Sequence, residues 1–557
     1  MHESSPLRLV IIGGVAAGAS AAARARRLSE TASITLIERG PDVSFANCGL
    51  PYFIGGEIKS RDALAVQTPQ TLKAMLALDV RTSTEVTAID RVAKHVRLRN
   101  LASGTTESLP YDRLVLAPGA VPLRPPLPGI DDPRLFTLRS LQDMDRIKAA
   151  AVAARRVTVI GAGFIGLEMA EQFVHLGKQV TLVELTAQVL PPLDPPMTLL
   201  LEDELRKHHV DLVLGDSVTA FEAGPALACR LASGRAVEAD LVVLSIGVRP
   251  DTALARAAGL YLGPRGHIRV NGFMQTSDPD IYAAGDAIET TDFVTHEPAA
   301  VPLGGPANRQ GRLAADHIFR PATTQPYPGA LGTAIVRAFA AAAGLTGWSE
   351  QRLRAAGRPY RTVTVNDNHH AGYYPGAQPI LLKLLWDPAT GRILGAQVSG
   401  LAGVDKRLDV IATAITGGLT IDDLAQLELA YAPPFGAAKD IVNLAGFTAC
   451  NTRDGLVTPV DELPADPAVQ ILDVRPPALV QSHPLPRAGA LNIPLGVLRT
   501  RLGELDRTRP VVTVCALGKT AYFAARILAQ HGFQVSALTG GIRAHFDPRS
   551  PAKLPAP

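Results

Sequence analysis

The sequence predicts an α/β protein built around two dinucleotide-binding Rossmann-like domains, and three observations support this fold class. Residues 7–18 resemble a buried strand that runs into a glycine turn, and residues 19–28 resemble a helix of small residues. Residues 34–38 then form a second apolar strand that ends in an acid, 20 residues after Gly18, as dinucleotide binding requires. The same pattern returns at residues 156–184, and this duplication is more specific than either motif alone.

Length and charge limit the possible classes of protein. The chain has 557 residues, which at about 150 residues per domain corresponds to roughly four domains. Hydrophobic residues make up 47% and charged residues 19%, so a largely disordered chain is excluded. The net charge of +3 gives no nucleic-acid or polybasic membrane signature, and no apolar run is long enough to span a bilayer. We therefore expect neither a nucleic-acid nor a membrane partner.

Four cysteines in a chain of this length exclude a disulfide scaffold. No two of them form a CxxC pair, which excludes a zinc ribbon and a thioredoxin-type dithiol, and we predict no metal site. The N-terminal residues have an acid where a signal peptide needs basic residues. We expect a cytoplasmic protein with reduced thiols, in which Cys229 and Cys450 are structural.

The first glycine turn, Gly13 to Gly18, has Val15 where the pattern requires its second glycine. We interpret it as a pyrophosphate site formed by backbone N–H groups at a helix N-terminus, with Glu38 accepting hydrogen bonds from ribose hydroxyls. An ordinary strand–helix turn is the structural alternative.

The second turn, Gly161 to Gly166, is complete, and Glu184 ends the strand that follows it. A carboxylate at this position favours the 2′-hydroxyl of NAD and repels the 2′-phosphate of NADP. The next residues, Leu185 and Thr186, include no base that could bind a phosphate. The sequence therefore predicts NADH in preference to NADPH.

Two dinucleotide sites in one chain suggest electron transfer from a nicotinamide to a flavin. The segments LVLAPG (114–119) and TSDPDIYAAGDA (276–287) fit, because the second has Asp286 in a Gly-Asp turn where it can bind a ribityl or phosphate group. Residues 7 to about 450 here resemble the pyridine nucleotide–disulfide oxidoreductases. The cofactor-binding residues expected for FAD and NADH are Gly13, Gly14, Ala17, Gly18, Glu38, Arg39, Ala117, Gly119, Gly161, Gly163, Gly166, Glu168, Glu184, Gly247, Gly285 and Asp286. We place Glu168 near the stack of nicotinamide and flavin.

A single cysteine follows the first unit, in SFANCGLPY (44–52). The dithiol members of this superfamily carry two cysteines at such a place, whereas Cys48 is alone. A lone thiolate cycles either as a mixed disulfide with an outside thiol or as a sulfenic acid. A buried structural cysteine is the alternative.

Four segments resemble the single-cysteine branch of the superfamily, and above all the coenzyme A disulfide reductases: SFANCGLPYFIGG (44–56), HAGYYPGA (370–377), GVDKRLDVIATA (403–414) and ELAYAPPFGAAKDIVN (428–443). The resemblance implies a homodimer in which Cys48 lies beside the flavin. It also implies that Tyr373 and Tyr431 reach the partner subunit's thiol site, where phenols can protonate a departing thiolate. Packing at an interface is the alternative role for either tyrosine.

Coenzyme A is a polyanion, so its site needs local positive charge. Arg24 and Arg27 are three residues apart and share a helix face, whereas we expect Arg26 to point elsewhere and to be solvated. For any one of these residues, an exposed solvated charge is the alternative. The resemblance adds Ser20, Ser44, Asn47, Lys73, Asn308 and Lys439 as coenzyme A contacts.

The C-terminal part resembles a rhodanese domain in four segments: ILDVR (471–475), GALNIPL (489–495), VTVCALGKTAYFAA (512–525) and VSALTGGI (535–542). Cys515 ends a strand and opens a loop before a helix, where consecutive N–H groups can hold a persulfide sulfur. Lys519 adds positive charge. The histidine usual before GALNIPL is absent, since LPRA (485–488) stands there, and His483 is a possible substitute. An inactive rhodanese-like binding module is the alternative.

These observations predict an α/β chain with FAD and NADH domains, an α+β dimerisation domain and a rhodanese α/β domain. The expected boundaries are 1–154 and 247–325 for the FAD domain, 155–246 for the NADH domain, 326–451 for dimerisation, 452–465 for a linker and 466–550 for the rhodanese domain, with a frayed tail.

The fused rhodanese domain favours coenzyme A persulfide or polysulfide as substrate, with H₂S as product, over coenzyme A disulfide. In this hypothesis Cys515 passes sulfane sulfur to coenzyme A near Cys48. Three alternatives remain open. An NADH oxidase or peroxidase would use Cys48 as sulfenic acid, a sulfurtransferase would use Cys515 as its main catalyst, and a redox sensor would bind FAD without turnover.

Overall fold

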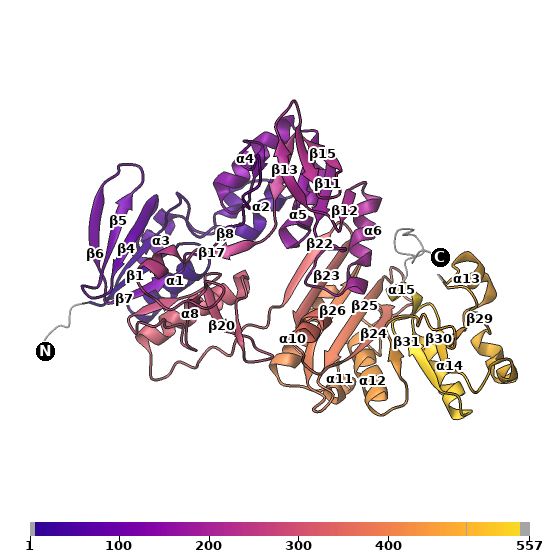
Figure 1. Cartoon of the computed structure of the whole chain (residues 1–557). Coiled ribbons are helices and arrows are strands. Elements are labelled where there is room, and N and C mark those ends of the chain that lie inside the picture. Colours follow the sequence, from indigo (N-terminus) through magenta and orange to yellow (C-terminus); the bar gives the residue numbers. More distant parts are fainter. Residues whose placement is uncertain (1–5, 486, 546–557) are drawn as a thin grey trace. The chain divides into compact units, whose positions relative to one another are not determined.

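The computed structural model describes residues 6–485 and 487–545 (Figure 1). Its contacts divide the chain into two compact units. Unit 1 extends to Ala187 and includes His209–Gly332, and unit 2 consists of Gln188–His208 and the chain from Thr333 onward. The expected rhodanese domain ends at residue 550, so its last five positions lie outside the described residues, as does the expected frayed tail.

Unit 1 contains the first predicted Rossmann sheet, whose five strands are all parallel. Four of its strands are largely buried and apolar, whereas the edge strand Asp79–Arg81 has no buried residue. Helix α1 (Ala17–Leu28) has alanines on its inner face, and it packs closely on α8 (Gly304–Phe319), because a Cβ at Gly311 would lie 2.0 Å from the Ala17 carbonyl oxygen. In order across the sheet, the strands are β19 (Ile281–Ala283), β7 (Arg113–Leu116), β1 (Arg8–Ile12), β2 (Ser33–Ile37) and β3 (Asp79–Arg81).

Smaller elements complete this half of unit 1. Helices α2 (Leu50–Ile54) and α3 (Pro69–Leu76) follow β2, and the 3-10 helix η1 (Asn47–Gly49) precedes α2. The antiparallel strands are β4 (Thr84–Asp90), β5 (His95–Asn100) and β6 (Thr106–Pro110); β8 (Ala120–Pro122) with β17 (Val248–Pro250); and β20 (Ile288–Thr291) with β21 (Pro298–Ala299), while β18 (Ile268–Arg269) joins β20 in parallel.

The second Rossmann sheet is also five-stranded and parallel. Helix α5 (Phe164–His175) starts at its glycine turn, and α4 (Leu141–Ala153) precedes its first long strand. The order is β12 (Asp211–Leu214), β11 (Gln179–Glu184), β10 (Arg156–Ile160), β16 (Leu241–Leu244) and β9 (Leu135–Phe136). A three-stranded antiparallel sheet accompanies it, formed by β13 (Val218–Glu222), β14 (Leu227–Leu231) and β15 (Ala236–Ala239).

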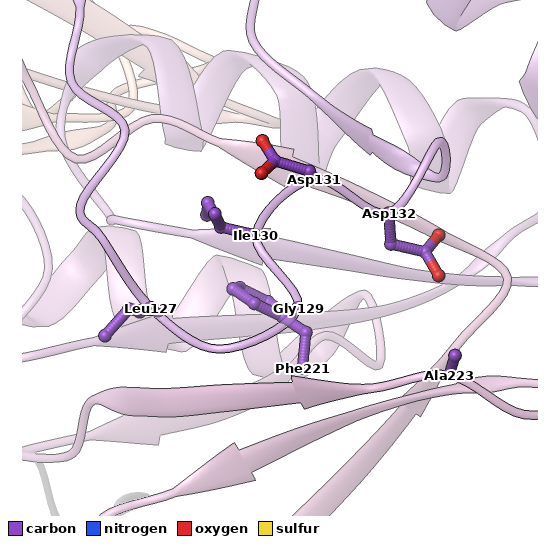
Figure 2. Close-up of a pocket in the computed structure, with 7 residues that line it drawn as sticks. All are labelled: Leu127, Gly129, Ile130, Asp131, Asp132, Phe221 and Ala223. Atoms are coloured by element: carbon purple, nitrogen blue, oxygen red, sulfur yellow. The ribbon is translucent and has the colours of Figure 1, made fainter.

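A pocket of about 310 Å³ lies between the 127–132 loop and β13, where Phe221 faces Gly129 (Figure 2). None of the site residues predicted from the sequence lines it.

Unit 2 contains a five-stranded antiparallel sheet with helices, the α+β arrangement expected for the dimerisation region. Its strands in order are β22 (Ala334–Ala338), β23 (Ala341–Gly347), β26 (Ile393–Gly400), β25 (Pro379–Trp386) and β24 (Arg361–Asn368). The helices are α9 (Glu350–Ala355), α10 (Val404–Thr416), α11 (Ile421–Gln426) and α12 (Ile441–Arg453).

The segment Gln188–His208, expected within the NADH domain, belongs to unit 2 and includes α6 (Leu199–Lys207). A buried ion network accounts for this placement, because Lys383 Nζ lies 3.0 Å from the Asp194 carboxylate and 2.5 Å from that of Glu350. Burial alone would lower the pKa of Lys383, but the two carboxylates outweigh it and raise the pKa. The amine therefore stays charged where both partners need it.

The last sheet of unit 2 is parallel and matches the expected rhodanese α/β pattern. Strand β27 (Pro459–Val460) joins it from within the range expected to be a linker. The other strands are β31 (Val535–Leu538), β30 (Val511–Val514), β28 (Gln470–Asp473) and β29 (Leu491–Asn492), with helices α13 (Pro477–Ser482), α14 (Lys519–Gln530) and α15 (Gly541–His545).

Two hydrogen bonds join the segment after strand β31 of this parallel sheet to strand β24 of the antiparallel sheet. Thr364 N donates to Thr539 Oγ1 at 2.8 Å, and that hydroxyl donates back to the Thr364 carbonyl at 3.0 Å. Both threonines are buried.

Candidate active site

The first glycine turn has the close packing that a dinucleotide cradle needs. Gly13 has φ +96°, and a Cβ there would lie 2.0 Å from the Ala117 carbonyl oxygen. A Cβ at Gly18 would lie 1.8 Å from the Gly13 carbonyl oxygen. Glu38 accepts hydrogen bonds from Gly14 N at 2.8 Å and Gly40 N at 2.7 Å, so its carboxylate is held beside the turn.

The second turn repeats this construction. Gly161 has φ +97°, and Glu184, which is buried, accepts hydrogen bonds from Ala162 N at 2.7 Å and Thr186 N at 2.9 Å. A Cβ at Gly166 would lie 1.8 Å from the Gly161 carbonyl oxygen, whereas nothing lies within 4 Å of a Cβ at Gly163. The open space at Gly163, at the N-terminus of α5, fits a pyrophosphate that approaches backbone N–H groups.

The remaining predicted cofactor residues lie at strand ends and turns. Gly119, Gly247 and Gly285 have positive φ, and Gly285 N donates to Gln310 Oε1 at 2.9 Å. Ala117 N donates to the Ile12 carbonyl at 2.7 Å, and Arg39 forms an ion pair with Asp251 at 3.2 Å.

Sequence reasoning missed Arg139. Its guanidinium donates to the Pro118 carbonyl at 2.9 Å, beside Gly119. Burial lowers the pKa of Arg139, and the carboxylates of Asp251 and Glu38 oppose that shift. Burial raises the pKa of Asp286, and the charge of Arg139 opposes it. No glycine or helix pattern marks an arginine of this kind, because its neighbours come from distant parts of the chain.

Cys48 lies in η1, between β2 and α2, and it is exposed. Loss of solvation at the sulfur raises the pKa of its thiol, and the carboxylates of Glu168 and Asp286 raise it further. The sequence analysis gave these three residues separate roles, with Cys48 beside the flavin, Glu168 near the nicotinamide and flavin, and Asp286 at a ribityl or phosphate group. In the fold, both carboxylates are close enough to Cys48 to act on its thiol.

Glu168 reaches this region from α5. Its carboxylate accepts a hydrogen bond from the Tyr52 hydroxyl at 3.1 Å, which links the segment after Cys48 to the helix of the second glycine turn. Tyr52 was part of the quoted motif, but its role was not predicted.

The residues expected to contact coenzyme A are only partly brought together. Ser20 Oγ donates to Asn308 Oδ1 at 2.6 Å, so these two lie side by side on α1 and α8. Arg24 pairs with Asp316 at 2.6 Å rather than presenting a free charge. Ser44 has φ +46° and is half-buried. Arg27, Asn47, Lys73 and Lys439 are exposed, the last of them in unit 2.

The expectation that Arg26 is solvated is wrong, because Arg26 is 6% exposed. Its guanidinium donates to the Ser29 and Glu30 carbonyls after α1 and to the Leu76 and Ala77 carbonyls at the end of α3. A cation at two helix C-termini satisfies carbonyls that lack helical partners. Helical spacing predicted that Arg26 points away from Arg24 and Arg27, but it could not predict that α3 lies there.

Tyr373 and Tyr431, which the resemblance assigns to a thiol site, lie side by side in unit 2. The hydroxyls of Tyr373 and Tyr431 lie 3.0 Å apart, and both side chains are exposed. Their hydrogen bond raises the pKa of the Tyr373 phenol.

A buried ion pair braces the two loops that carry the tyrosines. Arg407, on α10, pairs with Asp440 at 2.7 Å and donates to the His369 carbonyl at 2.6 Å. Both charged side chains are 3% exposed or less. These positioning residues stood inside the quoted segments, but their pairing depends on contacts distant in sequence.

Cys515 lies at the end of β30 and is buried. Gly518 N, with Gly518 at φ +89°, donates to its sulfur at 3.1 Å. The first residues of α15 support the loop, since Ile542 N donates to the Cys515 carbonyl at 2.9 Å and a Cβ at Gly541 would lie 2.4 Å from Gly518 N. Such a loop stabilises a thiolate or persulfide.

This domain contains a buried ion pair in addition to the charged residues considered in the sequence analysis. Arg475 and Asp473 form a buried ion pair at 2.6 Å, which sequence reasoning did not single out. Lys519 is exposed at the start of α14. His483 bonds Ser482 at 2.9 Å after α13.

The other two cysteines have the environments expected of structural thiols. Cys229 is fully buried in strand β14 of unit 1, and burial raises its pKa to about 12. Burial and Asp422 raise the pKa of Cys450 to about 11.

Glycine turns, a lone cysteine and a tyrosine pair together define a flavin- and nicotinamide-linked thiol oxidoreductase. The model of the pyridine nucleotide-disulphide oxidoreductase family matches residues 7–304, and the chain belongs to that family. The family's dimerisation domain matches residues 334–441, and a rhodanese-like domain matches residues 457–545.

Individual relatives carry more specific names than the family does. The chain is 34% identical over 444 residues to a coenzyme A disulfide reductase of Staphylococcus haemolyticus, covering 79% of this chain and 99% of that protein. It is 45% identical to reduced Bacillus anthracis CoADR-RHD, with a TM-score of 0.94 and coverage of 97% and 98%. It is 39% identical to an NAD-dependent persulfide reductase from A. fulgidus, with a TM-score of 0.91 and coverage of 97% and 100%.

No helix in the described part of the chain has both the length and the apolar character needed to cross a membrane.

Proposed function

We propose that this protein is a cytoplasmic homodimeric FAD- and NADH-dependent reductase of coenzyme A persulfide or polysulfide that releases H₂S, and that it also reduces coenzyme A disulfide. The observation that carries the proposal is the presence of two different sulfur sites in one chain. Cys48 lies close enough to Glu168 and Asp286 for both carboxylates to raise the pKa of its thiol, and the sulfur of Cys515 accepts a hydrogen bond from Gly518 N. Relatives named for both substrates share almost the whole architecture.

The cofactors fit the turns of this chain. Gly13, Gly14 and Gly18, with Glu38 and Asp286, would hold FAD, and Gly161, Gly163 and Gly166, with Glu184, would hold NADH. When bound, the two groups supply a pair of electrons to thiol chemistry. Glu184 would bind the ribose hydroxyls and disfavour NADPH.

Sulfur uptake is assigned to Cys515. Its thiolate attacks polysulfide, forms a Cys515 persulfide and releases a chain shortened by one sulfur. The coenzyme A thiolate then attacks the terminal sulfur, which gives coenzyme A persulfide and regenerates the Cys515 thiolate.

Reduction is assigned to Cys48. Its thiolate attacks the inner sulfur of coenzyme A persulfide, the one bonded to carbon. This attack forms a mixed disulfide between Cys48 and coenzyme A and releases the outer sulfur as HS⁻. Two electrons and one proton then return the Cys48 thiolate and coenzyme A thiol. Tyr373 and Tyr431 would donate the proton at the partner subunit's thiol site, and Ser20, Arg24, Arg27, Ser44, Asn47, Lys73, Asn308 and Lys439 would contact coenzyme A.

An anaerobic assay tests the proposal. Wild type and Cys48→Ser are mixed with NADH and coenzyme A persulfide, and NADH loss and sulfide release are followed together. We expect equal amounts of both from wild type and neither from Cys48→Ser. NADH loss that begins only when oxygen is admitted would replace this function with an oxidase.

One comparison favours that second function. A water-forming NADH oxidase from Lactobacillus brevis is 30% identical, with a TM-score of 0.78, and it covers 81% of this chain. The rhodanese-like match at residues 457–545 has no role in oxygen reduction, and we therefore prefer the sulfur substrates.

A further inference from the structure

A mixed cluster of carboxylate and imidazole donors lies in unit 1, outside the glycine turns. Glu57 follows α2, and Glu171 and His175 lie four residues apart on one face of α5. One potential ligand atom from each residue lies within 4.8 Å of the other two.

The distance between two of the three ligand atoms fits a small divalent cation. Bonds of about 2.0–2.2 Å to tetrahedral zinc place its ligand atoms about 3.3–3.6 Å apart. His175 Nδ1 and Glu57 Oε1 are already 3.6 Å apart. Glu171 is 1% exposed, whereas His175 and Glu57 are 40% and 36% exposed, so the cluster has a buried base and an open side.

A second observation comes from Gln172, which is completely buried beside the cluster. Its Nε2 donates to Glu57 Oε1 at 2.8 Å and orients that carboxylate. Its Oε1 has no hydrogen-bond donor among the described residues. That oxygen lies against Gly55, whereas the Nε2 contact with Glu57 is of the kind that orients a metal ligand.

The chain makes room for this arrangement at Gly55. A Cβ there would lie 2.0 Å from Gln172 Oε1, so only glycine lets the segment after α2 approach α5 this closely. The residues around the cluster are therefore packed to keep Glu57 against the helix.

We propose that Glu57, Glu171 and His175 form a binding site for a divalent transition-metal cation, with zinc as the representative ion. Imidazole and carboxylate ligands suit zinc, and three protein ligands leave one position for water. The cation joins the segment that follows Cys48 to helix α5. This site is independent of the proposed reductase activity.

The test measures bound zinc rather than activity. Holoenzyme is dialysed against zinc chloride, and zinc per chain is measured by mass spectrometry for wild type, His175→Gln, Glu171→Gln and the control His95→Gln. His95 lies in β5 of the same unit, outside the cluster. We expect wild type and His95→Gln to bind one zinc per chain more than the other two variants.

All variants keep the four thiols, so binding to cysteine cancels in the comparison. His175 is exposed at the end of α5, so its variant is expected to fold even if the buried Glu171→Gln does not. Zinc should also raise the Tm of wild type more than that of His175→Gln. Equal zinc and equal Tm shifts in wild type and His175→Gln would overturn the proposal.

Discussion

Cys48 and Cys515, the two thiols to which we assign sulfur chemistry, lie in opposite environments. Cys48 is exposed, and the carboxylates of Glu168 and Asp286 add to a pKa already raised by lost solvation. Cys515 is buried, and Gly518 N donates directly to its sulfur. The first thiol needs outside groups to stabilise its anion, whereas the second has donors built into its own loop.

The largest expected effect separates the two thiols by substrate. Cys48→Ser should lower NADH-dependent reduction of every sulfur substrate by roughly 10³-fold or more, because the proposed mixed disulfide forms on its thiolate. Cys515→Ser should lose turnover with inorganic polysulfide and keep that with coenzyme A disulfide. Steady-state NADH consumption with each substrate is the measurement, and equal losses of both activities in Cys515→Ser would contradict the division.

The next largest effect concerns the tyrosines proposed to protonate the thiolate that leaves the mixed disulfide at Cys48. Tyr431→Phe removes the hydrogen bond that raises the pKa of Tyr373, and it should lower kcat for coenzyme A disulfide by about 10²-fold if the pair is the general acid. Thiosulfate sulfurtransferase activity at Cys515 should not change, and it serves as the internal control. A kcat unchanged in Tyr431→Phe would assign the pair to interface packing.

A glycine pair tests the donor loop of Cys515. Gly541→Ala should lower sulfur transfer by about tenfold, because its Cβ would lie 2.4 Å from Gly518 N and displace the loop. Gly489→Ala is the matched control, since Gly489 also has positive φ but nothing lies within 4 Å of its Cβ. Sulfurtransferase rates are compared at equal Tm, and similar losses in both variants would point to general instability.

The smallest expected effect is a pH shift. Glu168→Gln removes a negative charge that raises the pKa of Cys48, so the thiolate should form at lower pH. Iodoacetamide alkylation of Cys48, followed against pH by mass spectrometry, should show its rising limb moved toward acid. Tyr52→Phe keeps the carboxylate and should leave the limb near its wild-type position. An alkylation profile that does not move in Glu168→Gln would show that the charge of Glu168 does not raise the pKa of Cys48.

Local patterns predicted much of this site. The glycine turns, Glu38 and Glu184 lie where their spacing placed them, because a strand–turn–helix unit is specified by neighbouring residues. Arg26 shows where such reasoning fails, since the carbonyls of α3 that bury it lie about 50 residues away in sequence. The segment around Asp194 shows the same limit, because its partner Lys383 lies in another sheet.

The sequence by itself determined the two Rossmann units, the lone Cys48 and the rhodanese-like segment around Cys515, because each is encoded in a short run of residues. Only the tertiary structure decided what surrounds them. The Glu168–Tyr52 bond, the Arg407–Asp440 brace and the Glu57–Glu171–His175 cluster join residues far apart in the chain. Such contacts depend on how helices and strands pack, and no local periodicity records them.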